Sequence, residues 1–488
     1  MFIRYAIYKT ALSQKIITGI VIIMAFFFIT FRFTETPRVW IDEGVFTEVA
    51  KNFAWHGKQG IQTAPNEIVS SAVIATSGYT LIVPVAASFY LFGTGLWQAR
   101  LLMIIFMSAL VFLFYFFMKK IHGSYWALFS VLLLLSFSPF YGNGRPVQGE
   151  IPGIVFLLLG SLLFLYWEER LFNNKRLALF SGLCFGLSAA TKPLFLMLLA
   201  PSLIISFFVF LKNKSTGKNL VLFFSGFLLP VFLWLFVQFP STDLFKSALY
   251  SYASGNSVSN VPLIPLIKHN LISFFTESTP ILFTALMVFA ISVFSYFTFF
   301  TGKRLFHWTE FFLLVFVAFN WLAYLKGPSW YRHFVPANIV LFLLFSSAAS
   351  VLYNEIPNKL VRRAIFTGVA TLLVFQFYHL FFLSQNSPLN TSNQNILLSQ
   401  SLSSIPSSKD VLFYDSIGAA IFLKHDNYFQ YLKPTDYLEF GIDNLKNINY
   451  DYIVTRSDKG FLCYNKKEIG KYFLYERFSD CHAVLRSP

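Results

Sequence analysis

The apolar residues of this chain are gathered into repeated runs of roughly 18 to 20 residues, the length that a helix needs to cross a bilayer. Because lipid offers the backbone no hydrogen-bonding partner, only helices and closed barrels can span it. The chain lacks the runs of about ten alternating residues that are typical of a transmembrane barrel. Of its 488 residues, 56% are hydrophobic and only 12% are charged. The sequence therefore predicts an all-α polytopic membrane bundle with about eleven spans, near residues 15–33, 98–118, 124–141, 150–167, 177–191, 193–211, 219–239, 279–300, 308–325, 335–353 and 364–384.

The net charge of +15 could suggest a nucleic-acid partner, but the Lys and Arg residues are scattered among short loops between the apolar runs. No single basic domain gathers them. We therefore expect membrane lipids and no nucleic acid as partners, and we interpret the basic loops as markers of membrane orientation.

One apolar stretch decides the topology: "TSGYTLIVPVAASFYLFG", residues 76–93. It is short, contains Pro84 internally and has no basic flank until Arg100. If it lies in the interface, the basic loops share the cytoplasmic side with the N-terminus, as the positive-inside rule requires; if it spans, every later basic loop moves outside. We therefore expect a juxtamembrane helix, an uncleaved first span and a cytoplasmic N-terminus. The basic loops are Lys119 with Lys120, Lys175 with Arg176, residues 212–218, Lys303 with Arg304, and residues 359–363.

The C-terminal part, after residue 384, is polar, whereas the rest of the chain consists mainly of apolar runs. We expect a membrane domain over residues 1–384, a Ser/Asn-rich linker over 385–400 and a small α/β extracytoplasmic domain over 401–488. "DVLFYD" and "YDYIVTR" are typical of buried strands, whereas "IGAAIFLKH" and "DYLEFGIDNLKN" favour short helices. Cys463 and Cys481 could form a disulfide outside the cytoplasm, and two unrelated thiols are the alternative.

Two adjacent acids, Asp42 and Glu43, follow the first span in an outer loop. One interpretation makes them an N-cap pair for an amphipathic helix that continues through Glu48 and Lys51. The other makes them functional. The predicted topology favours the second interpretation, because it places further charged loops on the same face, at residues 141–150, 191–193, 240–278 and 325–336.

These loops contribute one more acid and several cations. "GRPVQGE" carries Arg145 and Glu150 at the mouth of a span, and "TKP" places Lys192 in a tight hairpin. Lys192 could simply extend toward the interface. Arg332 and His333 stand in "SWYRHFVP" on the side that has few cations. Ionisable groups at membrane depth are costly and usually functional.

This combination suits a sugar carried on a polyprenyl phosphate. The lipid tail needs an apolar groove, the phosphate needs Lys or Arg, and the acceptor hydroxyl needs a base. Phosphate is already a good leaving group, so cations can replace a general acid. A glycosidase would normally need a matched pair of carboxylates. Asp42, Glu43 and Glu150 could also supply oxygen ligands to Mg²⁺ or Mn²⁺, although no spacing rule requires it.

Over roughly residues 1–385 the chain resembles GT-C-type integral membrane glycosyltransferases, the group that contains protein O-mannosyltransferases and aminoarabinose transferases. The resemblance is carried by "DE" at 42–43, by "LFGTGLWQAR" with the following span and "MKKIHG", by "GRPVQGE" and "AATKPLFL", and by "YRHFVP". The family's His-Pro-Pro or Lys-Pro-Pro before the juxtamembrane helix is replaced by "ATSGYT".

The resemblance implies an inverting glycosyltransferase in the bacterial cytoplasmic membrane, with its active site facing outward. It would use a polyprenyl-phosphate-linked sugar and an unidentified glycan, lipid or protein acceptor. Asp42 would be the base, with Glu43 and Glu150 orienting the acceptor or a metal. Lys192, Arg332, Arg145 and His333 would hold the donor phosphate. The alternatives are a polymerase or ligase that uses lipid-diphosphate-linked oligosaccharides, and a non-enzymatic lipid or solute transporter.

Overall fold

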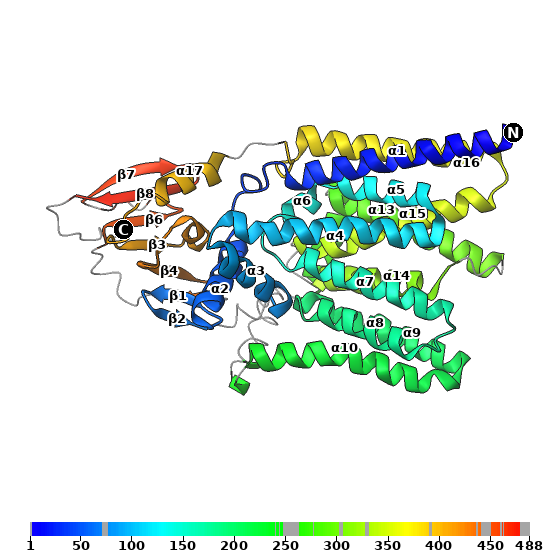
Figure 1. The fold of residues 1–488 in the computed structure, drawn as a ribbon, viewed down its shortest axis with the longest axis horizontal. Coiled ribbons are helices and arrows are strands. Elements are labelled where there is room, and N and C mark those ends of the chain that lie inside the picture. The colour runs from blue at the N-terminus through cyan, green and yellow to red at the C-terminus, as the bar shows by residue number, and fades with distance from the viewer. Residues whose placement is uncertain are drawn as a thin grey trace.

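The structure is a computed structural model and describes residues 2–70, 77–239, 241–243, 245–246, 263–276, 278–301, 306–326, 331–389, 393–435, 438–440, 450–458, 461 and 463–478. A bundle of long helices is joined at one end to a small sheet (Figure 1). The bundle contains α1 (Phe2–Thr30), α4 (Leu96–His122), α5 (Ser124–Ser136), α6 (Ser138–Gly144), α7 (Glu150–Glu169), α8 (Lys175–Ala189), α9 (Leu199–Lys212), α10 (Gly217–Gln238), α13 (Ser278–Ser295), α14 (Trp308–Lys326), α15 (Val335–Glu355) and α16 (Lys359–Tyr378).

The prediction of a polytopic helical bundle is confirmed. Among the described residues, eight helices are long and apolar enough to cross a membrane, and a ninth span results if the bent pair α5 and α6 counts as one. Two further predicted spans correspond to shorter segments: the apolar part of α1, Gln14–Thr30, and the 15-residue α8. Both lie alongside the longer helices (Figure 1).

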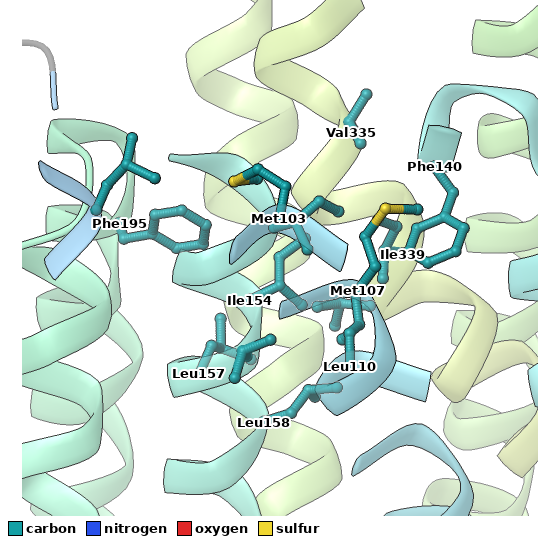
Figure 2. Packing of buried hydrophobic residues seen from close by; sticks show 14 of the residues in the cluster. Met103, Met107, Leu110, Phe140, Ile154, Leu157, Leu158, Phe195, Val335 and Ile339 are labelled. Carbon is teal, nitrogen blue, oxygen red and sulfur yellow. The ribbon is translucent and has the colours of Figure 1, made fainter. Parts of the chain in front are cut away.

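Helix α15 is the centre of the bundle, because nearly all of its apolar stretch is buried, whereas α16 is mostly exposed. Its side chains meet those of α4 and α7 at helical spacing, so that each helix contributes one apolar stripe to the core (Figure 2). The contributing side chains include Met103, Met107, Leu110, Ile154, Leu157, Val335 and Ile339.

The juxtamembrane prediction is also confirmed. Helix α2 (Ile41–His56) and α3 (Tyr79–Phe92) pack together at the end of the bundle where the sheet lies, which we call the sheet end (Figure 1). Both helices lie outside the bundle of long helices (Figure 1). Tyr90, Leu91 and Phe92 are exposed at the end of α3, as expected for a helix in the interface.

The loops at the opposite end of the bundle carry the basic residues. Lys120 pairs with Glu169 at 2.9 Å between the ends of α4 and α7. Glu168 accepts hydrogen bonds from the backbone N–H groups of Trp308 and Thr309, and so satisfies the first turn of α14. The end of the bundle opposite the sheet therefore carries the basic loops, as the predicted topology requires.

The C-terminal strands form a mixed six-stranded sheet in the order β5-β4-β3-β6-β8-β7. Its centre is parallel, because β3 pairs with β4 and β6 in the same direction, while β5, β7 and β8 are antiparallel additions. The strands are β3 (Val411–Tyr414), β4 (Tyr428–Thr435), β5 (Leu438–Phe440), β6 (Tyr452–Thr455), β7 (Tyr464–Ile469) and β8 (Tyr472–Arg477).

The predicted strands at "DVLFYD" and "YDYIVTR" are confirmed as β3 and β6, and the predicted short helix at "IGAAIFLKH" is confirmed as η7 (Ile417–Phe422). The helix predicted over "DYLEFGIDNLKN" is wrong for Leu438–Phe440, which pairs with β4 as an edge strand. Residues 436–437 and 441–447 of that stretch lie outside the described residues. A helix, α17 (Asn393–Leu402), occupies part of the predicted linker.

The sheet is not packed by itself. Its apolar residues Val411, Phe413 and Tyr428 belong to the same continuous core as the membrane helices and α2. Only the opposite face of the sheet has a small core of its own, around Leu412 and Tyr475. A two-stranded hairpin, β1 (Ile61–Ala64) and β2 (Glu67–Val69), lies against β4.

Candidate active site

Helix α2 places both predicted acids in its first turn rather than at its cap. The N-cap position is Trp40, which makes no capping hydrogen bond through its side chain. The N-cap interpretation of Asp42 and Glu43 is therefore wrong. Each of these carboxylates pairs instead with an arginine from a distant part of the chain.

Glu43 forms a fully buried ion pair with Arg100, which lies in the first turns of α4. Both carboxylate oxygens accept from the guanidinium at 2.8 Å, in the two-pronged geometry that suits arginine. Arg100 also donates to the carbonyl oxygens of Phe33 and Pro37, and Glu43 accepts from the backbone N–H of Val147. This pair joins three segments and leaves Glu43 inaccessible to a substrate.

Asp42 pairs with Arg332, which lies in the short helix η5 (Tyr331–Phe334) just before α15. About a quarter of each side chain remains exposed, 25% for Asp42 and 26% for Arg332. This partial exposure distinguishes Asp42 from the fully buried Glu43 and Glu150. Of the three predicted acids, only Asp42 can therefore meet a substrate from solvent without a rearrangement.

Glu150 begins α7 and forms an ion pair with Lys192 of the hairpin between α8 and the short helix η2 (Pro193–Leu198). Glu150 is completely buried, and Lys192 is nearly so. Among the described residues, the second carboxylate oxygen of Glu150, Oε2, has no hydrogen-bond partner. A buried carboxylate with one unsatisfied oxygen is a costly arrangement.

The Lys192 hairpin is held in place by the start of α3. The backbone N–H of Gly78 donates to the carbonyl of Thr191 at 2.9 Å, and the hydroxyl groups of Thr80 and Thr191 are 2.7 Å apart. A Cβ atom added at Gly78 would overlap the carbonyl oxygen of Ala190. Glycine is thus required here by close backbone approach.

Replacement of Gly78 by alanine is expected to lower the free energy of unfolding by about 1–3 kcal/mol, because the backbone of α3 and the hairpin must move apart. Gly368→Ala is the matched control, since a Cβ at Gly368 meets nothing within 4 Å. Thermal unfolding of the purified proteins measures the difference. Equal transition temperatures for the two variants would contradict the required close approach.

His333 lies within electrostatic reach of both Lys192 and Arg332. It therefore lies between the Asp42–Arg332 pair and the Lys192–Glu150 pair. The structure brings these predicted residues together at the sheet end of the bundle.

Arg145 does not belong to this group of cations. Its guanidinium is fully buried and donates to the carbonyl oxygens of Phe28, Phe31 and Thr36, so it closes the end of α1. Burial lowers the pKa of Arg145 to about 10, which leaves it protonated at neutral pH. These contacts assign it to the support of the site rather than to the donor phosphate.

The predicted metal ligands do not form a metal site in the part of the chain that the structure describes. No group of three His, Cys, Asp or Glu side chains is suitably placed there. Asp42, Glu43 and Glu150 are each paired with a different cation, so among the described residues their oxygens are not gathered into one ligand set.

Two residues with contacts to the predicted acids and to α2 were not predicted from the sequence. Arg100 is the partner of Glu43, and the only signal was its position in the stretch "LFGTGLWQAR" that carries the family resemblance. Tyr428 of the sheet contacts Glu48 and Lys51 on α2, and no local pattern predicted this. Glu48 and Lys51 were expected on the polar face of an amphipathic helix, yet the sheet covers and buries that face.

Comparisons with known proteins relate this geometry to other folds. The family model for dolichyl-phosphate-mannose-protein mannosyltransferase matches residues 84–236. No curated protein matches the sequence. Among solved structures, the chain is similar to ArnT from Cupriavidus metallidurans bound to undecaprenyl phosphate, with a TM-score of 0.60, 11% sequence identity and coverage of 97% of this chain and 98% of that chain.

The chain is also similar to the oligosaccharyltransferase AglB from Archaeoglobus fulgidus. The complex of AglB with an inhibitory peptide and a dolichol-phosphate gives a TM-score of 0.55 at 12% identity, covering 91% of this chain and 69% of that chain. The complex of the Archaeoglobus fulgidus enzyme with Zn and sulfate gives 0.58 at 13% identity, covering 90% and 68%. At such low identities the likeness establishes a shared fold.

Proposed function

We propose that this chain, which has the fold of the GT-C membrane glycosyltransferases, is an inverting glycosyltransferase that uses a polyprenyl-phosphate-linked sugar. The observation that carries the proposal is the meeting of Asp42, Arg332, His333, Lys192 and Glu150 at one end of an apolar bundle. The solved relatives bind undecaprenyl phosphate or dolichol-phosphate, which are isoprenoid phosphates of the proposed donor class.

The proposed reaction is a single displacement. The acceptor hydroxyl attacks the anomeric carbon of the sugar, its proton passes to the Asp42 carboxylate, and the bond from that carbon to the phosphate oxygen breaks. The electron pair leaves with the polyprenyl phosphate. Lys192 and Arg332 stabilise the charge that grows on this phosphate, and Arg332 can share its donors between Asp42 and the phosphate.

The active site is proposed to open on the outer face of the bacterial cytoplasmic membrane. The basic loops lie at the opposite end of the bundle, which the positive-inside rule assigns to the cytoplasm. Cys463 in the sheet is disulfide-bonded, and disulfides persist mainly outside the reducing cytoplasm. Its predicted partner Cys481 lies outside the described residues.

The direct test uses the purified protein in lipid nanodiscs with synthetic polyprenyl-phosphate sugars. Transfer is followed as release of free polyprenyl phosphate. Mass spectrometry of surface glycolipids and glycoproteins, from cells with and without the gene, then identifies the acceptor as the molecule that loses a sugar. Absence of both release and a missing sugar would contradict the proposal.

The likeness to an oligosaccharyltransferase favours one alternative, transfer of an oligosaccharide from a lipid diphosphate. The same assay separates the two, because that reaction releases a lipid diphosphate. Movement of an intact lipid without cleavage would instead indicate a transporter.

Lys192 is expected to contribute to donor binding. Replacing it alone would leave Glu150 as an uncompensated buried charge, so the informative variant is Lys192→Gln combined with Glu150→Gln. We expect this double variant to bind polyprenyl phosphate about tenfold or more weakly, since a charge-assisted bond to phosphate is worth about 1.5–3 kcal/mol. The dissociation constant is measured by titration with polyprenyl phosphate, with Glu150→Gln alone as control. Equal affinity in both variants would remove Lys192 from the donor site.

A further inference from the structure

The C-terminal domain contacts the helix that carries Asp42 from Gly44 to Lys51. Gly418 of η7 and Gly44 of α2 approach so closely that a Cβ on Gly44 would lie 2.5 Å from the Cα of Gly418. Gly44 is only two residues from Asp42. The absence of side chains at this crossing lets the two backbones meet directly.

A buried polar network continues the contact along α2. The hydroxyl of Tyr428 donates to Glu48 at 2.5 Å and accepts from the Nζ of Lys51 at 3.0 Å. Lys51 also pairs with Asp426 at 2.5 Å, while Gln62 donates to the backbone carbonyl of Tyr428 at 3.0 Å. Burial, together with the Glu48 carboxylate, holds the pKa of Tyr428 well above its usual range, so its hydroxyl keeps the proton that it donates.

The segment just before α2 is fixed from the same side. The side-chain amide of Asn395, in α17, accepts from the backbone N–H of Val39 at 3.1 Å. It also donates to the carbonyl oxygens of Thr34 and Pro37. Pro37 in turn accepts from Arg100, the partner of Glu43. Both the entry to α2 and the face that carries Glu48 and Lys51 are thus set by residues that follow the last span.

We infer that the C-terminal sheet and α17 act as a positioning element for the proposed base, with Tyr428, Gly418 and Asn395 holding α2 so that Asp42 faces Arg332. The inference rests on the proposed function, because it assigns a purpose to the position of Asp42. Within the described part of the chain, Tyr428, Gly418 and Asn395 contact α2 and the segment just before it, so they act on Asp42 through the helix. A displacement of about 1 Å at a reacting group can cost up to about a hundredfold in rate.

The first test compares two tyrosines of the same sheet. Tyr428→Phe removes the hydroxyl that holds α2, whereas Tyr475→Phe removes a hydroxyl that donates to Asp458 at 2.6 Å on the opposite face. We expect Tyr428→Phe to lower kcat between about ten- and a hundredfold, with KM for the polyprenyl-phosphate sugar within about twofold of the wild type. Tyr475→Phe should keep the wild-type kcat. Equal kcat values in the two variants would overturn the inference.

A double-variant cycle separates positioning from general loss of stability. If Tyr428 acts through Glu48, the loss of kcat in Tyr428→Phe combined with Glu48→Gln should be no larger than that of the worse single variant. Independent structural damage would instead multiply the two losses, and that result would count against the inference.

A readout without turnover keeps the test independent of the proposed function. Hydrogen exchange of the α2 amides, Ile41–His56, should be about tenfold faster in Tyr428→Phe than in Tyr475→Phe, because the helix loses its anchor. If the wild type transfers no sugar but this difference appears, the proposed reaction fails while the positioning contact stands. Equal exchange in the two variants overturns the positioning element whatever the reaction.

Discussion

Asp42→Asn is expected to lower the rate of sugar transfer by about 10²–10⁴-fold, the range that a general base contributes. Asparagine has nearly the same volume as aspartate and can still accept a hydrogen bond from Arg332, but it cannot take the proton of the acceptor. Affinity for polyprenyl phosphate should therefore stay within about twofold of the wild type. The measurement is single-turnover release of polyprenyl phosphate, paired with a titration of donor binding.

The control for this prediction is Asp451→Asn, which removes a carboxylate paired with Lys409 at an exposed position of the sheet. This variant should transfer sugar at the wild-type rate. Full turnover in Asp42→Asn would remove Asp42 as the base. If Glu150→Gln were then inactive, the base would have to be Glu150, which pairs with Lys192 rather than with Arg332.

Arg100→Met is expected to lower the free energy of unfolding by about 3–5 kcal/mol. The substitution leaves Glu43 fully buried without its cation, and it also deprives the carbonyl oxygens of Phe33 and Pro37 of a donor. The yield of monodisperse protein in detergent and the midpoint of thermal unfolding measure the loss.

The compensating variant makes this prediction specific. Combining Arg100→Met with Glu43→Leu removes both charges, and replacing a buried ion pair by apolar groups is often neutral or stabilising. The double variant should therefore be more stable than Arg100→Met alone, although Phe33 and Pro37 still lack their donor. Equal instability of the two variants would show that the charge of Glu43 is not what Arg100 compensates.

The architecture of the membrane bundle followed from the sequence because crossing a membrane is a property of single segments. A run that is long and apolar enough partitions into lipid whatever its neighbours are. The same reasoning predicted a short interfacial helix over residues 76–93 from its length and Pro84, and the structure has a 14-residue apolar helix there, α3. The resemblance to GT-C glycosyltransferases is likewise confirmed, by the family model over residues 84–236 and by the shared fold.

The ion pairs within the site depend instead on contacts between distant segments. Asp42 meets Arg332, which is 290 residues away, and Glu43 meets Arg100 at a separation of 57 residues. The sequence predicted that these loops share one face, but it did not predict which carboxylate meets which cation. It therefore treated Glu43 as a catalytic candidate, whereas the structure buries it against Arg100.

The predictions of a helix at Leu438–Phe440 and of an exposed Glu48 were wrong for related reasons. An edge strand forms because a neighbour offers unpaired backbone groups, and β4 supplies them. Glu48 is polar and was expected in solvent, yet Tyr428, a residue 380 positions away, covers it. In both cases tertiary contacts decided against the local pattern.

The sequence by itself thus determined where the apolar helices lie along the chain, that the charged loops gather on one face, and the class of ligand that such charges suit. These depend on the transfer of individual segments from water to lipid and on the charge of the loops that join them. Only the tertiary structure decided which ions pair and that Asp42, of the three acids, stays partly exposed. It also decided that the C-terminal domain packs against α2. Those features depend on distances between segments far apart in the chain, which the packing of the helices sets.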